Sequence, residues 1–169
     1  REGTPVVDVE AIRAFLSEWQ FPLYFFDYET YASAVPLIDR TSPHKHFPVQ
    51  YSLHVLREDG TLEHHEYLEQ EARLPDRLLA KLSGEIGPEG SIVSWHASFE
   101  KTRNKEMAEL LPAFADFLID VNERTVDLED AFKKSYVDAR FDGSTSIKKL
   151  LPVLCPELSY EGLGVQDGA

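Results

Sequence analysis

Cysteine is almost absent from this sequence, since Cys155 is the only one among 169 residues. A single cysteine excludes an internal disulfide and a cysteine-rich zinc site, and it suits a reducing compartment. No apolar run approaches the ~20 residues that a membrane-spanning helix needs. We therefore expect a cytoplasmic protein that has no membrane partner.

Basic residues are also scarce, with 17 Lys and Arg against 30 Asp and Glu and a formal net charge of -13. Non-specific coating of nucleic acid depends on clustered Lys and Arg, so this charge argues against a protein of that class. It leaves open an enzyme that holds a few nucleotides through metal ions.

Size and composition indicate one globular domain, because 169 residues with 43% hydrophobic and 11% aromatic content can bury a core. The chain starts at Arg1 rather than Met, and residues 166–169 show no obvious helix end. We expect a piece of a longer protein with additional domains. Residues 1–20 are predicted to be a lead-in helix, and residues 21–169 a main domain that is incomplete at its carboxyl end.

Hydrophobic periodicity predicts alternating helices and strands. A helix over residues 5–19 is expected to be capped by Asp8, and strands are expected at 23–30, 50–57 and 61–68. Further along the chain we expect a helix after Pro75, a strand at 91–95, a helix capped by Ser98, a helix after Pro112, a strand at 125–128, and a helix after Ser144 and Ser146 that Pro152 limits. This order predicts an α/β fold, with a mixed sheet of about five strands flanked by helices and the later strands parallel to the first.

Two carboxylates lie two residues apart on the first long strand. Alternation along a strand directs the side chains of Asp27 and Glu29 to the same face. Crowded carboxylates beside an apolar strand need a compensating positive charge, and hard oxygen ligands suit Mg²⁺ or Mn²⁺. The alternative is a solvent-exposed strand end that the acids merely mark.

A second polar segment follows the predicted strand at 91–95. It reads His96-Ala97-Ser98-Phe99-Glu100 and opens a helix. Glu100 falls in the first turn, at the carboxyl end of a strand, where α/β proteins gather their sites. An ordinary acid of a helix N-terminus and a structural histidine are the plain alternatives for Glu100 and His96.

Taken in order, these segments resemble the motifs of the DEDD exonucleases, the DnaQ-like branch of the ribonuclease H-like superfamily. The string Phe26-Asp27-Tyr28-Glu29-Thr30 is similar to the first motif of the branch. In the second motif, His96 takes the position of the family's Asn and Glu100 that of its Asp. Residues 125–128 and 146–150 resemble the later strand and helix. The resemblance runs from about residue 21 to the end, and it is closest to an uncharacterised bacterial branch in which Phe-Glu replaces Phe-Asp.

The resemblance implies a ribonuclease H-like three-layer fold and a 3′→5′ exonuclease that acts on single-stranded nucleic acid, DNA or RNA. By this analogy two Mg²⁺ or Mn²⁺ ions are bound, with Asp27, Glu29 and Glu100 as catalytic ligands. Tyr28, Thr30, His96 and Phe99 become candidates for substrate binding, with Tyr28, Tyr31 and Phe99 able to stack on bases. Core packing is the alternative for Phe99.

The third motif of the family departs from its pattern in this sequence. The family has His or Tyr four residues before an Asp, whereas Tyr160 and Asp167 are seven apart. We take Asp167 as the candidate fourth catalytic and metal ligand, and the alternatives are a ligand beyond Ala169 or none. Asp127 matches a family strand position, where a metal role is the less favoured interpretation.

Other functions remain open at this point. A catalytically inactive nuclease-like binding module within a larger protein is the main alternative, and an integrase or structure-specific nuclease is a third. In the Pro-rich loop after the first long strand, Arg40, Lys45 and His46 are either substrate-phosphate contacts or solvated residues. That loop offers no Cys or acidic partner at zinc spacing.

Overall fold

The computed structural model describes residues 3–36, 38 and 41–158, and the chain forms two compact units. One unit is Trp19–Asp127, and the other joins Arg1–Glu18 to Leu128–Ala169. The predicted boundary between residues 20 and 21 falls close to the first junction. Whether residues 21–169 act as one functional domain stays a prediction.

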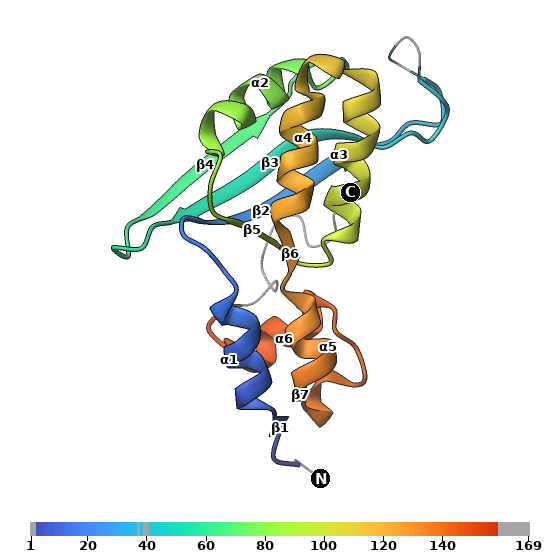
Figure 1. Ribbon diagram of the computed structural model, residues 1–169. Coiled ribbons are helices and arrows are strands. Elements are labelled where there is room, and N and C mark those ends of the chain that lie inside the picture. Colours follow the sequence, from blue (N-terminus) through green and yellow to red (C-terminus); the bar gives the residue numbers. More distant parts are fainter. Residues whose placement is uncertain (1–2, 37, 39–40, 159–169) are drawn as a thin grey trace. The chain divides into compact units, whose positions relative to one another are not determined.

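The larger unit contains a five-stranded mixed sheet (Figure 1). Its strands are β2 (Leu23–Tyr31), β3 (Phe47–Leu56), β4 (Leu62–Leu68), β5 (Ser91–Ser94) and β6 (Thr125–Asp127). Their order across the sheet is β4-β3-β2-β5-β6. The strands β2, β3 and β4 pair antiparallel with one another, while β5 is parallel to both β2 and β6. The predicted α/β class, with a mixed five-strand sheet flanked by helices, is confirmed.

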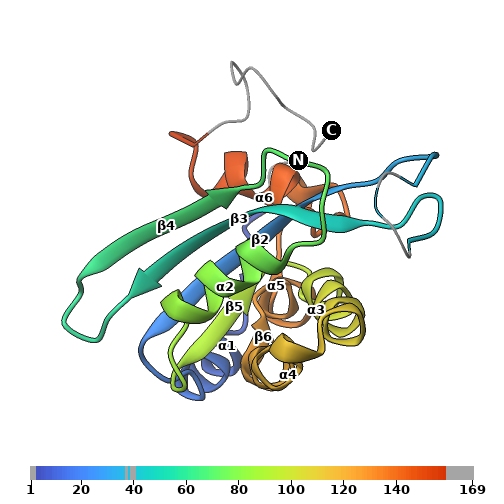
Figure 2. The ribbon, with the colours of Figure 1, turned by 90° about the horizontal axis from the view of Figure 1, so that it is seen from above.

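Helices of the larger unit pack on one face of this sheet, as Figure 2 shows from above. They are α2 (Asp76–Glu85), α3 (Ser98–Leu110), the short 3-10 helix η1 (Pro112–Phe114) and α4 (Ala115–Arg124). The strands contribute alternate residues to the core beneath them, because side chains alternate between the two faces. From β2 and β3 these are Tyr24, Phe26, Tyr28, Tyr51, Leu53 and Val55, which face one another in register.

Asp27 and Glu29 alternate with the buried residues of β2, so both carboxylates lie on the face away from this core. Their common face was predicted and is confirmed. A register shift between Glu29 and Thr30 interrupts the pairing with β3 directly after the second acid. Bulges of this kind are frequent next to active sites, where they re-aim a side chain.

The first turn of α3 differs from the prediction. Ser98 is the first helical residue rather than the cap, and Ala97 at the cap position makes no side-chain hydrogen bond. Helical spacing predicts an inner face made of Phe99, Thr102, Arg103, Met107 and Leu110. The residues buried on α3 are instead Glu100, Asn104 and Met107. Two of these are polar, so hydrophobic periodicity alone rotated the helix incorrectly.

The smaller unit is mostly helical. Its elements are β1 (Val6–Val7), α1 (Val9–Ser17), α5 (Glu129–Ser135), β7 (Tyr136–Val137), η2 (Ala139–Phe141) and α6 (Ile147–Leu154). Asp8 caps α1 as predicted, since its side chain accepts a hydrogen bond from the Ala11 backbone N–H at 3.0 Å. Val7, expected in that helix, instead pairs with Tyr136 in a small antiparallel ladder.

Helix α6 contains Pro152 and ends at Leu154, two residues after the proline. Ser146 occupies the cap position of this helix, but its side chain makes no capping bond. Across the described ranges, no helix has both the length and the apolar character that crossing a bilayer requires.

Candidate metal centre

Asp27 and Glu29 lie on a part of β2 that pairs with β3 on one side and is unpaired on the side of β5. Pairing with β5 covers only Leu23–Phe25, because β5 ends at Ser94 and the chain turns into α3. The first turn of α3 brings Glu100 to this gap, where its carboxyl group lies within hydrogen-bonding reach of Asp27. We call Asp27, Glu29 and Glu100 the acidic cluster.

Burial dominates the electrostatics of Glu100, whose side chain is 3% exposed. Loss of water raises the pKa of Glu100 to about 8, against the opposing effect of nearby backbone amides, and the charge of Asp27 raises it further. The pKa of Asp27 is also raised, first by desolvation and then by the charge of Glu29. Although part of Asp27 reaches solvent, the cluster strongly favours holding a proton or a cation.

The ionised form of Glu100 leaves a polar atom uncompensated. Its Oε2 is buried and accepts no hydrogen bond. Among the residues that the structure describes, no Lys or Arg forms an ion pair with any member of the acidic cluster. A buried carboxylate oxygen that accepts no hydrogen bond and is not paired with any described Lys or Arg fits a divalent ion bound through hard oxygen ligands.

The cluster is nevertheless not a finished metal site. Within the described ranges no group of three or more His, Cys, Asp or Glu side chains is placed to hold an ion. Asp27 and Glu100 adjoin, whereas Glu29 acts on Asp27 through its charge. Asp167 lies outside the described residues, so its predicted role as fourth ligand stays a prediction.

Amide side chains that the sequence analysis missed hold α3 against β2. The Tyr28 hydroxyl donates to Asn104 Oδ1 at 3.1 Å, and Asn104 Nδ2 donates to Asn122 Oδ1 at 2.9 Å. Asn122 Nδ2 in turn donates to the Lys101 carbonyl at 3.1 Å. Asn104 lies one turn after Glu100 on the same helix face, so this chain of bonds fixes where Glu100 points.

The loop between β5 and α3 is held by Asp127. His96 adopts a left-handed conformation with φ of +59°, which is uncommon for a residue other than glycine. Its backbone N–H donates to Asp127 Oδ1 at 2.9 Å. Ser94 anchors the preceding strand, donating from Oγ to the Phe26 carbonyl at 2.8 Å. Asp127 is thus a positioning residue for the segment that delivers Glu100.

The predicted substrate-binding residues lie in different surroundings. Tyr28 is a core residue, 3% exposed, so the structure does not bring its ring to the surface. Thr30 Oγ1 lies 3.0 Å from His46 Nδ1, which ties the loop to the strand end. Phe99 is half-buried beneath the guanidinium of Arg103, 5.3 Å from the ring centre. His96 is exposed.

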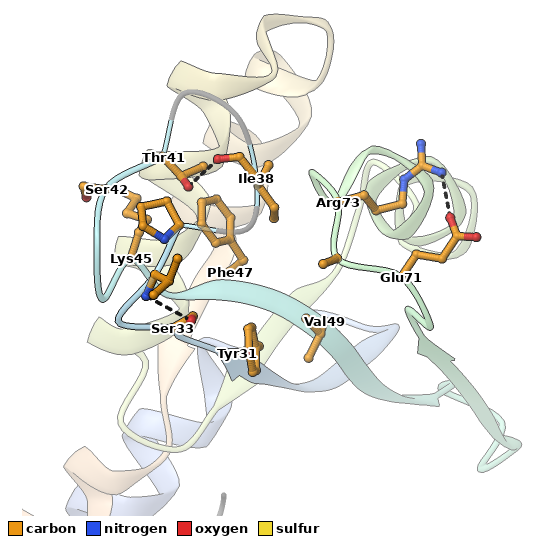
Figure 3. Close-up of a pocket in the computed structure, with 13 residues that line it drawn as sticks. Tyr31, Ser33, Ile38, Thr41, Ser42, Lys45, Phe47, Val49, Glu71 and Arg73 are labelled. Atoms are coloured by element: carbon orange, nitrogen blue, oxygen red, sulfur yellow. Dashed lines mark hydrogen bonds and ion pairs between the residues drawn. The ribbon is translucent and has the colours of Figure 1, made fainter.

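A small pocket, open to solvent, lies past the end of β2 (Figure 3). Tyr31, Phe47 and Val49 come from the paired strands, and the following loops complete the wall. Two cations border it, but Lys45 Nζ pairs with Glu106 at 2.9 Å and Arg73 with Asp76 at 3.1 Å. Arg40, named above as a phosphate contact, lies outside the described residues.

Comparison with known families places most of the larger unit in one of them. The model of a domain of unknown function, DUF2779, matches residues 24–146. The chain belongs to the DUF2779 family. The match contains the whole acidic cluster and Asp127, and it ends before Asp167.

A relative of this DUF2779 chain occurs in Mycoplasma pneumoniae, where it carries the name "Uncharacterized protein MG366 homolog". The two sequences are 30% identical over 170 residues, which cover 85% of this chain and 25% of the relative. The chain therefore spans about a quarter of the length of that protein. No solved structure matches the chain.

Proposed function

We propose that this domain is a metal-dependent nuclease of ribonuclease H-like fold, which hydrolyses phosphodiester bonds as a 3′→5′ exonuclease on single-stranded nucleic acid. The observation that carries the proposal is the contact between Asp27 and Glu100, two carboxyl groups from distant elements, one with an orphaned buried oxygen. The motif order and a sheet of three antiparallel strands followed by parallel β5 and β6 support it.

In the proposed reaction the three acids of the cluster serve as metal ligands. Asp27, Glu29 and Glu100 would hold Mg²⁺ or Mn²⁺, two ions being expected with Asp167 as a further ligand. Bound divalent ions lower the pKa of water and neutralise charge on a phosphodiester. Asp127 fixes the loop that carries Glu100, and Asn104 fixes its helix face. His96 and Phe99, on the same loop and helix start, are proposed to contact the substrate strand.

A non-catalytic binding module within a larger cytoplasmic protein is the second candidate. One observation favours it, namely that the described residues contain no three-ligand group ready for an ion. In that case the acids are a remnant, and the domain binds nucleic acid or another domain without hydrolysis. Metal-dependent activity separates the two candidates.

The test is hydrolysis of 5′-labelled single-stranded DNA and RNA oligonucleotides in Mg²⁺, in Mn²⁺ and in EDTA. We expect stepwise shortening from the 3′ end with either metal and none in EDTA. Asp27→Asn, Glu29→Gln and Glu100→Gln should each lower the rate at least 100-fold, about 2.7 kcal/mol in barrier.

Glu109→Gln is the matched control, an exposed acid on the same helix as Glu100. It should retain the parental rate, and circular dichroism should show all variants folded. Activity that survives EDTA, or that persists in Asp27→Asn, contradicts the proposal. Binding without hydrolysis in every metal supports the module.

A further inference from the structure

Two histidines face each other across the β3–β4 hairpin. His54 and His64 are directly opposite in the antiparallel register. Their rings stack with centroids 4.2 Å apart and planes 13° from parallel. They lie on the sheet face away from the hydrophobic core, where His64 is exposed and His54 is half-buried. Neither position belongs to the acidic cluster.

The spacing of this pair is close to what one metal ion needs. Two imidazole nitrogens bound to a tetrahedral Zn²⁺ at ~2.0–2.1 Å lie about 3.3 Å apart. The stacked rings hold their nitrogen lone pairs in nearly parallel planes, so both side chains must rotate about their χ angles before the two nitrogens point at one ion. Direct cross-strand pairs hold their Cβ atoms about 4.5–5.5 Å apart, so the backbone already places both side chains within reach of one ion.

The local environment favours the neutral imidazole that a metal requires. Burial lowers the pKa of His54, and the neighbouring His64 lowers it further. Ser52 Oγ lies 3.5 Å from His64 Nε2, on the same face and one alternate position from His54. Glu66, opposite Ser52, adds negative charge to the same face of the hairpin.

We propose that His54 and His64 form a second metal site, selective for a late first-row ion such as Zn²⁺ or Ni²⁺, with water completing the coordination. Imidazole nitrogen binds these ions and is a poor ligand for Mg²⁺, so this site and the acidic cluster select different metals. A bound ion joins β4, the edge strand of the sheet, to β3. The site does not depend on the proposed nuclease activity.

Isothermal titration of the untagged chain with Zn²⁺ and with Ni²⁺, in excess Mg²⁺, tests the proposal. We expect one ion bound at the hairpin, with affinity reduced at least tenfold in His54→Asn and in His64→Asn. His44→Asn is the matched control for an exposed histidine elsewhere, and Asp27→Asn is the control for the acidic cluster. Both controls should retain the parental affinity.

Parental affinity in either hairpin variant would overturn the proposal, as would a loss confined to Asp27→Asn. A measurement on the unmodified protein avoids any folding defect of the variants. Substoichiometric Ni²⁺ should broaden amide NMR signals of residues 52–56 and 62–66 first. Broadening centred on residues 44–46 or on Asp27 would place the ion elsewhere and refute the site.

Discussion

Glu100 combines two properties that seldom occur together in a structural residue. It is buried, and its carboxyl group lies within hydrogen-bonding reach of another carboxyl group, that of Asp27. A structural buried acid normally pairs with Lys or Arg, because an uncompensated ion costs several kcal/mol. Under the proposed function, Glu100 binds a cation, and it should lower stability when the cation is absent.

The first prediction concerns the pH dependence of stability in EDTA. The pKa of Glu100 is about 8 in the folded chain, against about 4.3 unfolded, so between these values the folded state holds the extra proton. The free energy of unfolding should therefore fall as pH rises from 5.5 to 8.5, by on the order of a few kcal/mol. Asp27, with its raised pKa, contributes with the same sign at the lower end.

Urea unfolding at pH 5.5, 7.0 and 8.5 measures this slope. Glu100→Gln should flatten most of it, while Glu109→Gln, an exposed acid on the same helix, should leave it unchanged. Saturating Mg²⁺ should restore stability at pH 8.5 in the parent and in Glu109→Gln, but not in Glu100→Gln. A parental profile in EDTA that is flat, or that rises with pH, would mean that Glu100 has a compensating partner.

Single residues show where prediction from sequence stops. The common face of Asp27 and Glu29 follows from the two-residue period of a strand, and the structure confirms it. The contact of Glu100 with Asp27 joins residues 73 positions apart in the sequence, and motif order alone suggested it. Asn104 was not predicted, because a polar residue on an inner helix face gives no hydrophobic signal. Its spacing of four from Glu100 nevertheless places both residues on one face of the helix.

Among the elements, β2 and β5 decide where the acidic cluster lies. Their parallel pairing begins with Leu23 opposite Ser91 and ends at Phe25, two residues before Asp27. The strands and their parallel order were predictable from apolar runs and turn residues. The cap of α3 was not, because the left-handed His96 and its bond to Asp127 fix the loop, and Ser98 is left inside the helix.

Gly90 is the close contact that sets this register, and it gives the second prediction. Its φ is +97°, and a Cβ there would lie 2.1 Å from the Pro22 carbonyl oxygen. Pro22 and Gly90 directly precede β2 and β5. Gly90→Ala should therefore destabilise the fold by about 3 kcal/mol or more, since backbone strain and a backbone clash add.

Gly60→Ala is the matched control, because φ is +85° at Gly60 but nothing lies within 4 Å of the added Cβ. It should cost about 1 kcal/mol from the left-handed conformation alone. Urea unfolding of both variants gives the difference. Equal losses would show that the strands can shift without cost, and that Gly90 does not fix the position of Asp27.

On the scale of the whole molecule, the hydrophobic core and the proposed chemistry occupy the same unit. All members of the main core cluster fall between Tyr24 and Val121, and the acidic cluster falls in the same range. The sequence predicted one main domain beginning near residue 21, whereas the grouping of Arg1–Glu18 with Leu128–Ala169 depends on contacts such as Val6 with Val137. Such distant pairings of short strands carry no local signal.

The last prediction separates the fold of the larger unit from completion of its metal site. Because Trp19–Asp127 contains the entire main core, this fragment should unfold cooperatively in urea. If Asp167 is the fourth ligand, the fragment should bind Mg²⁺ at least tenfold more weakly than the whole chain, about 1.4 kcal/mol. Asp167→Asn in the whole chain should reproduce that loss, measured as the Mg²⁺ dependence of the melting temperature. Glu157→Gln, an exposed acid past the end of α6, is the control and should leave it unchanged. If the fragment binds Mg²⁺ weakly while Asp167→Asn keeps the parental affinity, the missing ligand is another residue outside the fragment. Equal Mg²⁺ affinity in the fragment, in Asp167→Asn and in the whole chain would mean that the acidic cluster binds the ion without further ligands.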